Sequence, residues 1–239
     1  MRPNQSQRVA TLVSFATMVA LAGLLDVNVK AETEETFIQR VVAQTTRSGV
    51  AVRATRELRA GTVSGKHQGW MSVETTVSPT GAFKWTILEE GGSERTRNKV
   101  FRALLETEEQ TCRDGAGDGA ALTPANYEFA PLPPNAEGQV QIRLTPRRKD
   151  PKLIEGTLTV TADGYPLVLE GKMAKSPSFW VKSVRVVKRY GRFAGVALPT
   201  TVESTADIKM FGESKFTMRY RYSEVNGRAI SHSMASIAP

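Results

Sequence analysis

The sequence predicts a mainly β (α+β) fold: one large, curled antiparallel sheet that forms an incomplete barrel, with two main helices on its concave side. Apolar and polar residues alternate with a period of two from Val50 to Ile87 and again from Val140 to Tyr222, as in strands that bury one face. Helical spacing is confined to two short stretches. No strand–helix–strand alternation is found along the 239 residues, which argues against a parallel sheet.

The first 31 residues are typical of a secretory signal peptide. Arg2 and Arg8 precede an uncharged apolar run, Val9–Leu25, and Val29–Ala31 has small residues at the two positions that signal peptidase reads. The run of 17 residues is shorter than the about 20 that a membrane-spanning helix needs. We therefore expect residues 1–31 to be cleaved and the protein to be periplasmic; the alternative is an uncleaved N-terminal anchor.

The two predicted helices each carry one apolar stripe. Residues 32–47 place Phe37, Ile38, Val41 and Val42 on one face of a helix. Residues 93–109 do the same with Val100, Phe101, Leu104 and Leu105, and Ser93 is the expected N-cap of that helix.

Strands are predicted wherever the period of two holds. They cover residues 50–58, 67–77, 83–87, 140–144, 154–162, 167–173, 179–189, 201–210 and 216–222. Asp163-Gly164 is a strong hairpin signal between two of them. Thr111–Pro134 is rich in Gly and Pro and is predicted to be irregular, and 179–189 is predicted to be buried on both faces.

Two short helices cannot cover about nine or ten strands that lie flat, so the sheet is expected to curl around them. Apolar area that the helices leave open would be a cavity for an apolar ligand. We expect one such domain, residues 32–227, followed by a flexible tail, residues 228–239. The predicted ligand-binding wall consists of Phe83, Trp85, Ile87, Leu158, Val160, Leu167, Leu169, Ile208, Met210, Phe216, Met218 and Tyr220. The alternative for these residues is a close-packed core without a void.

The chain carries little of the chemistry that catalysis or metal binding needs. One cysteine, Cys112, excludes an intramolecular disulfide and a Cys-rich zinc site. The two histidines, His67 and His232, are far apart, which argues against a His-rich metal site. Glu89 and Glu90 are neighbours on a strand and face opposite ways, so they do not form a carboxylate pair. We expect no catalytic residues, no metal and no cofactor.

The chain is basic, with a net charge of +8 and a pI of about 9.7. A basic exported protein can meet anionic lipid or acidic polysaccharide, although a solvated surface with a modest excess of one sign is the simpler explanation. The densest cluster, Arg147-Arg148-Lys149, is expected in a loop. Nucleic acid is not an expected partner, because the charge is modest and export removes the chain from it.

At several motifs the sequence resembles the LolA/LolB-like superfamily of periplasmic lipoprotein carriers and their relatives. Gly69-Trp70 on the second predicted strand belongs to this likeness, and the other motifs lie in the C-terminal half. These motifs are Leu153–Gly156, Ser176–Lys182, Gly195–Pro199, Glu203–Ala206, Tyr220–Tyr222 and Val225–Gly227. The carriers have a short Asp-Gly and aromatic signature after their third strand, and here 93–109 and 111–134 occupy that place. The resemblance also implies an arginine that locks a lid, for which Arg53 on the first strand is the candidate.

The resemblance and the apolar inward face together predict a periplasmic, non-enzymatic protein that binds a lipid or the acyl moiety of a lipoprotein. The expected partners are acyl chains, an envelope protein and, transiently, a membrane surface. Two alternatives stay open: an exported hydrolase that acts on envelope material, and an interaction module without a cavity.

Overall fold

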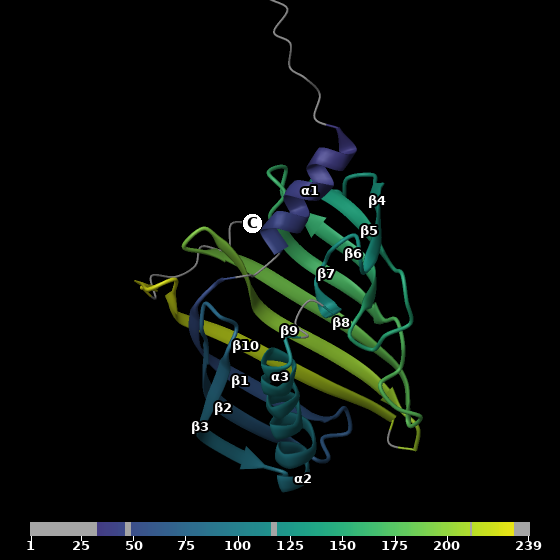
Figure 1. The fold of residues 1–239 in the computed structure, drawn as a ribbon. Coiled ribbons are helices and arrows are strands. Elements are labelled where there is room, and N and C mark those ends of the chain that lie inside the picture. The colour runs from purple at the N-terminus through teal and green to yellow at the C-terminus, as the bar shows by residue number, and fades with distance from the viewer. Residues whose placement is uncertain (1–32, 46–48, 116–118, 211, 232–239) are drawn as a thin grey trace, which may run out of the picture. The chain divides into compact units, whose positions relative to one another are not determined.

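An antiparallel sheet of 11 strands dominates the computed structural model, which describes residues 33–45, 49–115, 119–210 and 212–231 (Figure 1). The elements are α1 (Glu34–Thr45), β1 (Val52–Thr62), β2 (Gly69–Val77), β3 (Phe83–Gly92), α2 (Glu94–Thr96), the π-helical segment η2 (Arg97–Arg102), α3 (Ala103–Arg113), β4 (Tyr127–Leu132), β5 (Val140–Pro146), β6 (Ile154–Val160), β7 (Pro166–Met173), β8 (Val181–Phe193), β9 (Val196–Ile208), β10 (Gly212–Val225) and β11 (Arg228–Ala229). The predicted signal peptide, residues 1–31, and residues 232–239 of the predicted tail lie outside the described residues.

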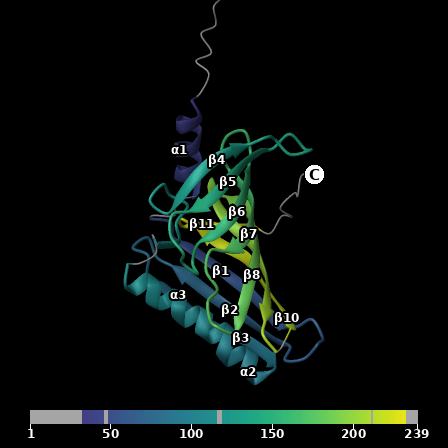
Figure 2. The ribbon, with the colours of Figure 1, turned by 90° about the vertical axis from the view of Figure 1, so that its right-hand side faces the viewer.

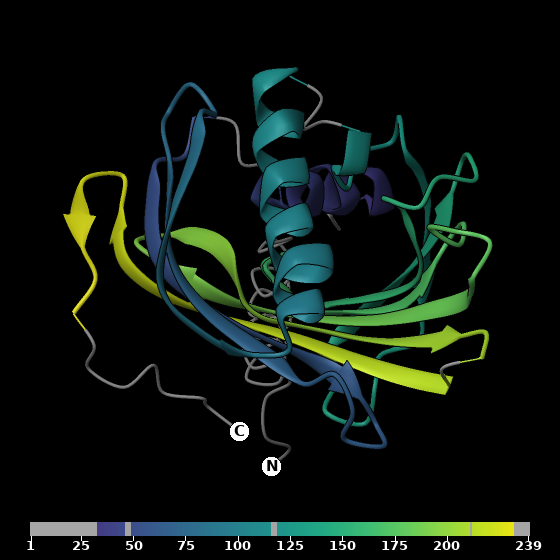
Figure 3. The same ribbon diagram turned by 90° about the horizontal axis from the view of Figure 1, so that it is seen from below.

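The strands follow the order β3-β2-β1-β10-β9-β8-β7-β6-β5-β4, with the short β11 on β10. Most neighbours in this order are also neighbours in sequence; the exception is the pairing of β1 with β10, in which Leu58 lies opposite Met218. This pairing joins the first three strands to the rest. Within the described residues, β3 and β4 each have one neighbour, so the sheet is open. It curves around α1 and α3, which confirms the predicted fold class (Figure 3).

The two helices lie on the same side of the sheet, at opposite ends of its concave face (Figure 2). Each covers its own hydrophobic core. The first core joins α1 to β4–β7 and contains Val41, Leu122, Tyr127, Ile142, Leu144, Leu153, Leu158, Val160 and Leu169. The second joins the helix over residues 94–113, called the α2–α3 helix below, to β1–β3 and β10; it contains Leu58, Met71, Val73, Phe83, Phe101, Leu105 and Met218. A third, smaller core of Ala54, Leu198, Tyr222 and Val225 joins β1, β9 and β10. The apolar stripes of the sequence are thus buried as predicted, but the two helices cover separate cores.

The α2–α3 helix begins as the sequence predicts and ends later. The Ser93 side chain accepts a hydrogen bond from the Thr96 backbone N–H at 3.3 Å, which confirms Ser93 as the N-cap. The helix continues through a π-helical segment to Arg113. Within the described residues, no helix is both long enough and apolar enough to span a bilayer.

Three strand assignments differ from the sequence prediction. The stretch 111–134 contains β4, which sits at an edge of the sheet, where Pro131 does not interrupt a ladder on both sides. Strand β8 alternates between buried and exposed residues instead of being buried on both faces, because the helices cover one face of the sheet only. Arg228–Ala229, at the start of the predicted tail, pairs with the end of β10.

Candidate functional site

The predicted cavity wall is divided between the two cores. Leu158, Val160 and Leu169 belong to the first, and each is at most 3% exposed. The second holds or borders Phe83, Trp85, Ile87, Phe216, Met218 and Tyr220. Leu167 and Ile208 are half-buried and belong to neither core. The twelve residues therefore do not converge on one volume.

Met210 does not face the concave side, which corrects its place in the predicted wall. It is 90% exposed and lies in the β9–β10 turn with a φ of 70°. The strand alternation on which the prediction relied ends at Ile208, so the period of two no longer sets the direction of the Met210 side chain.

Arg56 is the most notable polar residue of the concave face. Its side chain is only 6% exposed and forms a two-pronged ion pair with Glu108 of α3, with Nη1–Oε2 at 2.6 Å and Nη2–Oε1 at 3.0 Å. Nε donates to Thr75 Oγ1 at 3.1 Å. The guanidinium lies 5.0 Å from the ring centroid of Phe83 and 5.1 Å from that of Tyr220. These contacts tie the sheet to the helix above it.

Burial acts to lower the pKa of Arg56, but the electrostatic interactions with Tyr220 and Glu108 outweigh burial, so the pKa lies above its ordinary value. Arg56 is therefore charged at any physiological pH. A buried charge of this kind needs its partner in place.

Arg53, the candidate for the lid arginine that the resemblance implies, lies on the exposed side of β1. Arg56 is the arginine that reaches the helix. The signal was present in the sequence, because Arg56 shares the inward face with Ala54 and Leu58 in a strand whose other arginines alternate outward. An arginine on the apolar face of a strand indicates a charge that is buried and paired in the fold.

Further polar contacts hold the α2–α3 helix on the sheet. Trp85 Nε1 donates to Glu109 Oε2 at 3.1 Å, next to the Arg56–Glu108 pair. At the other end of the helix, Glu90 contacts Nη1 of Arg97 at 2.6 Å and Nη2 of Arg102 at 2.8 Å. The helix is thus attached through separate ion pairs and hydrogen bonds in addition to the packing of its apolar stripe.

The ion pairs of Glu90 predict acid sensitivity. The hydrogen bond from Arg102, followed by the charges of Arg102 and Arg97, holds the pKa of Glu90 below its ordinary value of 4.5. A carboxyl group with a lowered pKa in the folded state contributes stability above its unfolded pKa and loses it as the pH falls through the folded pKa. We expect the free energy of unfolding to fall as the pH drops below about 4.5, and this fall to be smaller in Glu90→Gln. Urea denaturation between pH 3 and 7 measures both; equal slopes for the two proteins would contradict the role of Glu90.

Between the two cores, the concave face is only partly covered. Met218 of the second core pairs with Val202, and Phe216 pairs with Ser204, so the even-numbered residues of β9 face inward. These residues, Val202, Ser204, Ala206 and Ile208, are called the β9 strip, and all four are half-buried. Phe37 and Ile38 of α1 and Leu104 of α3 are also half-buried beside the two cores. Water therefore reaches apolar groups along the middle of the concave face.

Two hollows lie away from the predicted wall. One, of about 670 Å³, lies along β5–β8 and is lined by outward residues such as Arg143, Thr157, Glu170 and Arg185. The other, of about 480 Å³, lies between α3 and Lys152. Both are lined largely by polar and charged residues, and neither includes any of the twelve predicted residues.

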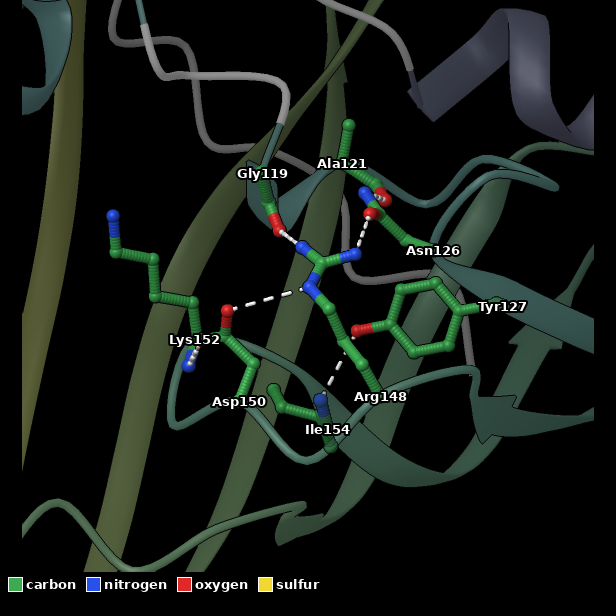
Figure 4. Close-up of polar contacts among 8 residues, drawn as sticks. All are labelled: Gly119, Ala121, Asn126, Tyr127, Arg148, Asp150, Lys152 and Ile154. Carbon is green, nitrogen blue, oxygen red and sulfur yellow. Dashed lines mark hydrogen bonds and ion pairs between the residues drawn. The ribbon is translucent and has the colours of Figure 1, made fainter.

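The basic cluster at 147–149 has a structural role (Figure 4). Arg148 donates to Asn126 Oδ1 at 2.6 Å and to the Gly119 carbonyl at 2.8 Å, and it lies 3.4 Å from Asp150. Arg147 donates to the Pro124 carbonyl at 2.8 Å. The two arginines therefore fasten the segment before β4 to the β5–β6 connection.

Cys112 lies half-buried at the border of the second core. Burial raises the pKa of its thiol, and the nearby Glu108 raises it further, against the opposing charge of Arg56. The thiol is thus kept in its protonated, less nucleophilic form.

A scan against models of protein families and a search of curated proteins find no match to this chain. Two solved structures are similar in fold. A LolA superfamily protein from Nitrosomonas europaea has 11% identity and a TM-score of 0.40, with 84% of this chain and 96% of that chain covered. A DUF1329 family protein from Desulfovibrio piger has 8% identity and a TM-score of 0.42, with 80% of this chain and 91% of that chain covered. The first of the two carries the superfamily name that the sequence resembles.

Proposed function

We propose that this protein is a periplasmic, non-enzymatic carrier that holds the acyl chain of a lipid or lipoprotein against its concave face. The observation that carries the proposal is the β9 strip, which stays half-buried between the two cores, with Val202 packed against the second of them. Covering this strip with an acyl chain would remove apolar area from water, at about 25 cal/mol per Å². A packed core has no water-exposed apolar area that a ligand could cover.

The attachment of the α2–α3 helix supports the same proposal. Its polar contacts with the sheet are side-chain pairs, of which Arg56–Glu108 is the most buried. Residues beneath and beside the helix, Trp85 and Phe216 among them, are themselves half-buried. A small displacement of the helix would therefore extend the β9 strip into the second core and lengthen the surface available to an acyl chain.

Two neighbouring residues of β9 test the proposal. Ala206 faces inward in the strip, whereas Thr205 faces outward between Lys215 and Arg185. We expect Ala206→Glu to weaken the binding of a fluorescent fatty-acid probe at least about tenfold, because the introduced carboxylate meets an apolar chain and repels its acid headgroup. Thr205→Glu should bind the probe as the parent protein does.

Probe titration, with circular dichroism as the control for folding, separates the outcomes. Equal binding by both variants would place the ligand elsewhere. The absence of probe binding by the parent protein would remove the proposed function.

A further inference from the structure

A compact group of exposed apolar side chains lies at one end of the sheet, away from the cores. Phe179 and Trp180, in the β7–β8 connection, are 77% and 57% exposed, and Met210, in the β9–β10 turn, is 90% exposed. The Lys209 backbone N–H donates to the Trp180 carbonyl at 2.8 Å, so the two connections lie side by side, at the lower right of Figure 1. Phe179, Trp180 and Met210 are called the aromatic tip below.

The aromatic tip is ordered by its own contacts. The rings of Phe179 and Trp180 meet edge to face, with centroids 5.6 Å apart. Lys209 Nζ lies 3.7 Å from the ring centroid of Phe179. Single exposed apolar residues are common on protein surfaces, but a contiguous set in two adjoining connections marks a contact surface.

Met210 adds an argument from backbone strain. A long side chain in the left-handed region, at a φ of 70°, is conformationally unfavourable, and an apolar side chain that is 90% exposed gains nothing from burial in return. Glycine or asparagine would suit this turn better on both counts. A residue that lowers the stability of the free protein without a compensating contact suggests that it contacts another molecule.

The charges around the aromatic tip indicate what covers it. Residues 175–182 contain Lys175 and Lys182 and no acidic residue. Lys182 is paired with Asp207 at 3.3 Å, whereas Lys175 is exposed and Lys209 lies over the Phe179 ring. Lysine is depleted in the cores of protein–protein interfaces. Tryptophan and phenylalanine with flanking lysines are instead typical of segments that enter the headgroup region of a bilayer, where the ammonium groups meet anionic phosphates.

We propose that the aromatic tip docks the protein onto an anionic lipid bilayer, with its three apolar side chains in the headgroup region and the neighbouring lysines on lipid phosphates. The aromatic tip adjoins the end of the β9 strip, where Val181 pairs with Ile208, but it shares no residue with the strip. Docking on a bilayer can therefore be measured apart from acyl-chain binding. Such docking is reversible and shallow, because the apolar contribution comes from three side chains.

Co-sedimentation with vesicles tests this proposal, with protein expressed from its full-length coding sequence and purified without detergent. The parent protein should bind vesicles of phosphatidylglycerol and phosphatidylethanolamine, bind pure phosphatidylcholine vesicles at least about tenfold more weakly, and be released by salt. The triple variant Phe179→Ser/Trp180→Ser/Met210→Ser should lose at least about tenfold in binding. Leu88→Ser is the matched control, because Leu88 is 53% exposed on β3, and β2, β1 and β10 lie between β3 and β9. All variants should keep fatty-acid probe binding, which separates this test from that of the proposed function.

Two single variants sharpen the test. Trp180→Phe should retain vesicle binding but lose the blue shift of tryptophan fluorescence, which identifies the residue that enters the bilayer. Met210→Gly should weaken vesicle binding while it raises the midpoint of thermal unfolding, and a residue with a purely structural role would not separate the two effects.

Equal vesicle binding by the parent protein and the triple variant would overturn the proposal. A parent protein that does not bind vesicles would overturn it too. If that protein forms a dimer and the triple variant is monomeric, the aromatic tip contacts a second copy of the chain.

Discussion

Glu108→Ala is expected to lower the free energy of unfolding by about 3 kcal/mol, a large loss for the removal of one partly exposed carboxylate. The loss arises at Arg56, whose side chain is 6% exposed and would keep its charge without its partner. Breaking a buried ion pair costs about 3–5 kcal/mol. We expect the lower end of this range because the Glu108 side chain is 36% exposed, so water can reach the vacated position.

A double variant tests whether the unpaired charge of Arg56 causes the loss of stability. In Arg56→Met/Glu108→Leu both charges are absent and the new side chains have similar volumes, so its stability should lie within about 1.5 kcal/mol of the parent protein. The coupling energy from the double-mutant cycle should therefore be large and favourable. Arg56→Met alone should cost less than Glu108→Ala, because the carboxylate that it leaves is the more exposed partner.

Urea denaturation of the parent protein, Arg56→Met, Glu108→Leu and the double variant measures this cycle. Losses that simply add would mean that Arg56 and Glu108 contribute separately, and the ion pair would then not be what fastens the α2–α3 helix to β1.

The architecture was predictable from sequence because strand and helix periods are local properties. Each strand has an inward face that its own sequence defines. In β1 this face contains Val52, Ala54 and Leu58, and in β10 it contains Phe216, Met218 and Tyr220. The sequence contains too little helix to cover the sheet, and this alone requires curvature. Strand β4 was not predicted because Pro131, the prolines after the strand and the glycines before it mask a short edge strand.

The site was less predictable, because it depends on distances between strands that the period of two does not specify. The pairing of β1 with β10 brings Arg56 close to Tyr220, and residues so far apart in sequence cannot be matched from one chain. Nine of the twelve wall residues lie in or beside one of two cores, beneath α1 or the α2–α3 helix, whereas Leu167, Ile208 and Met210 belong to neither. Which inward residues stay half-buried follows from where the helices lie along the sheet.

The second large expected effect is a loss of stability on truncating a fully buried residue of strand β7. Leu169 is 3% exposed in the first core, and Leu169→Ala should cost about 2–5 kcal/mol, because the truncated side chain leaves a cavity that its packed neighbours cannot fill. Leu169→Arg should prevent folding, since it would place a charge in the first core at a position that is 3% exposed. This corrects the expectation that Leu169 lines an open cavity.

Leu167 is the matched control, with the same side chain two residues earlier on the same strand. It is half-buried and belongs to neither core, so Leu167→Ala should cost about 1 kcal/mol or less. Chemical denaturation compares the two alanine variants, and fatty-acid probe binding is measured on each at a temperature where both are folded. We expect neither to lose probe binding as Ala206→Glu does, because neither residue belongs to the β9 strip. A small cost at Leu169 with loss of probe binding would instead place the acyl chain in the first core, beneath α1, and would move the ligand site from β9 to β6 and β7.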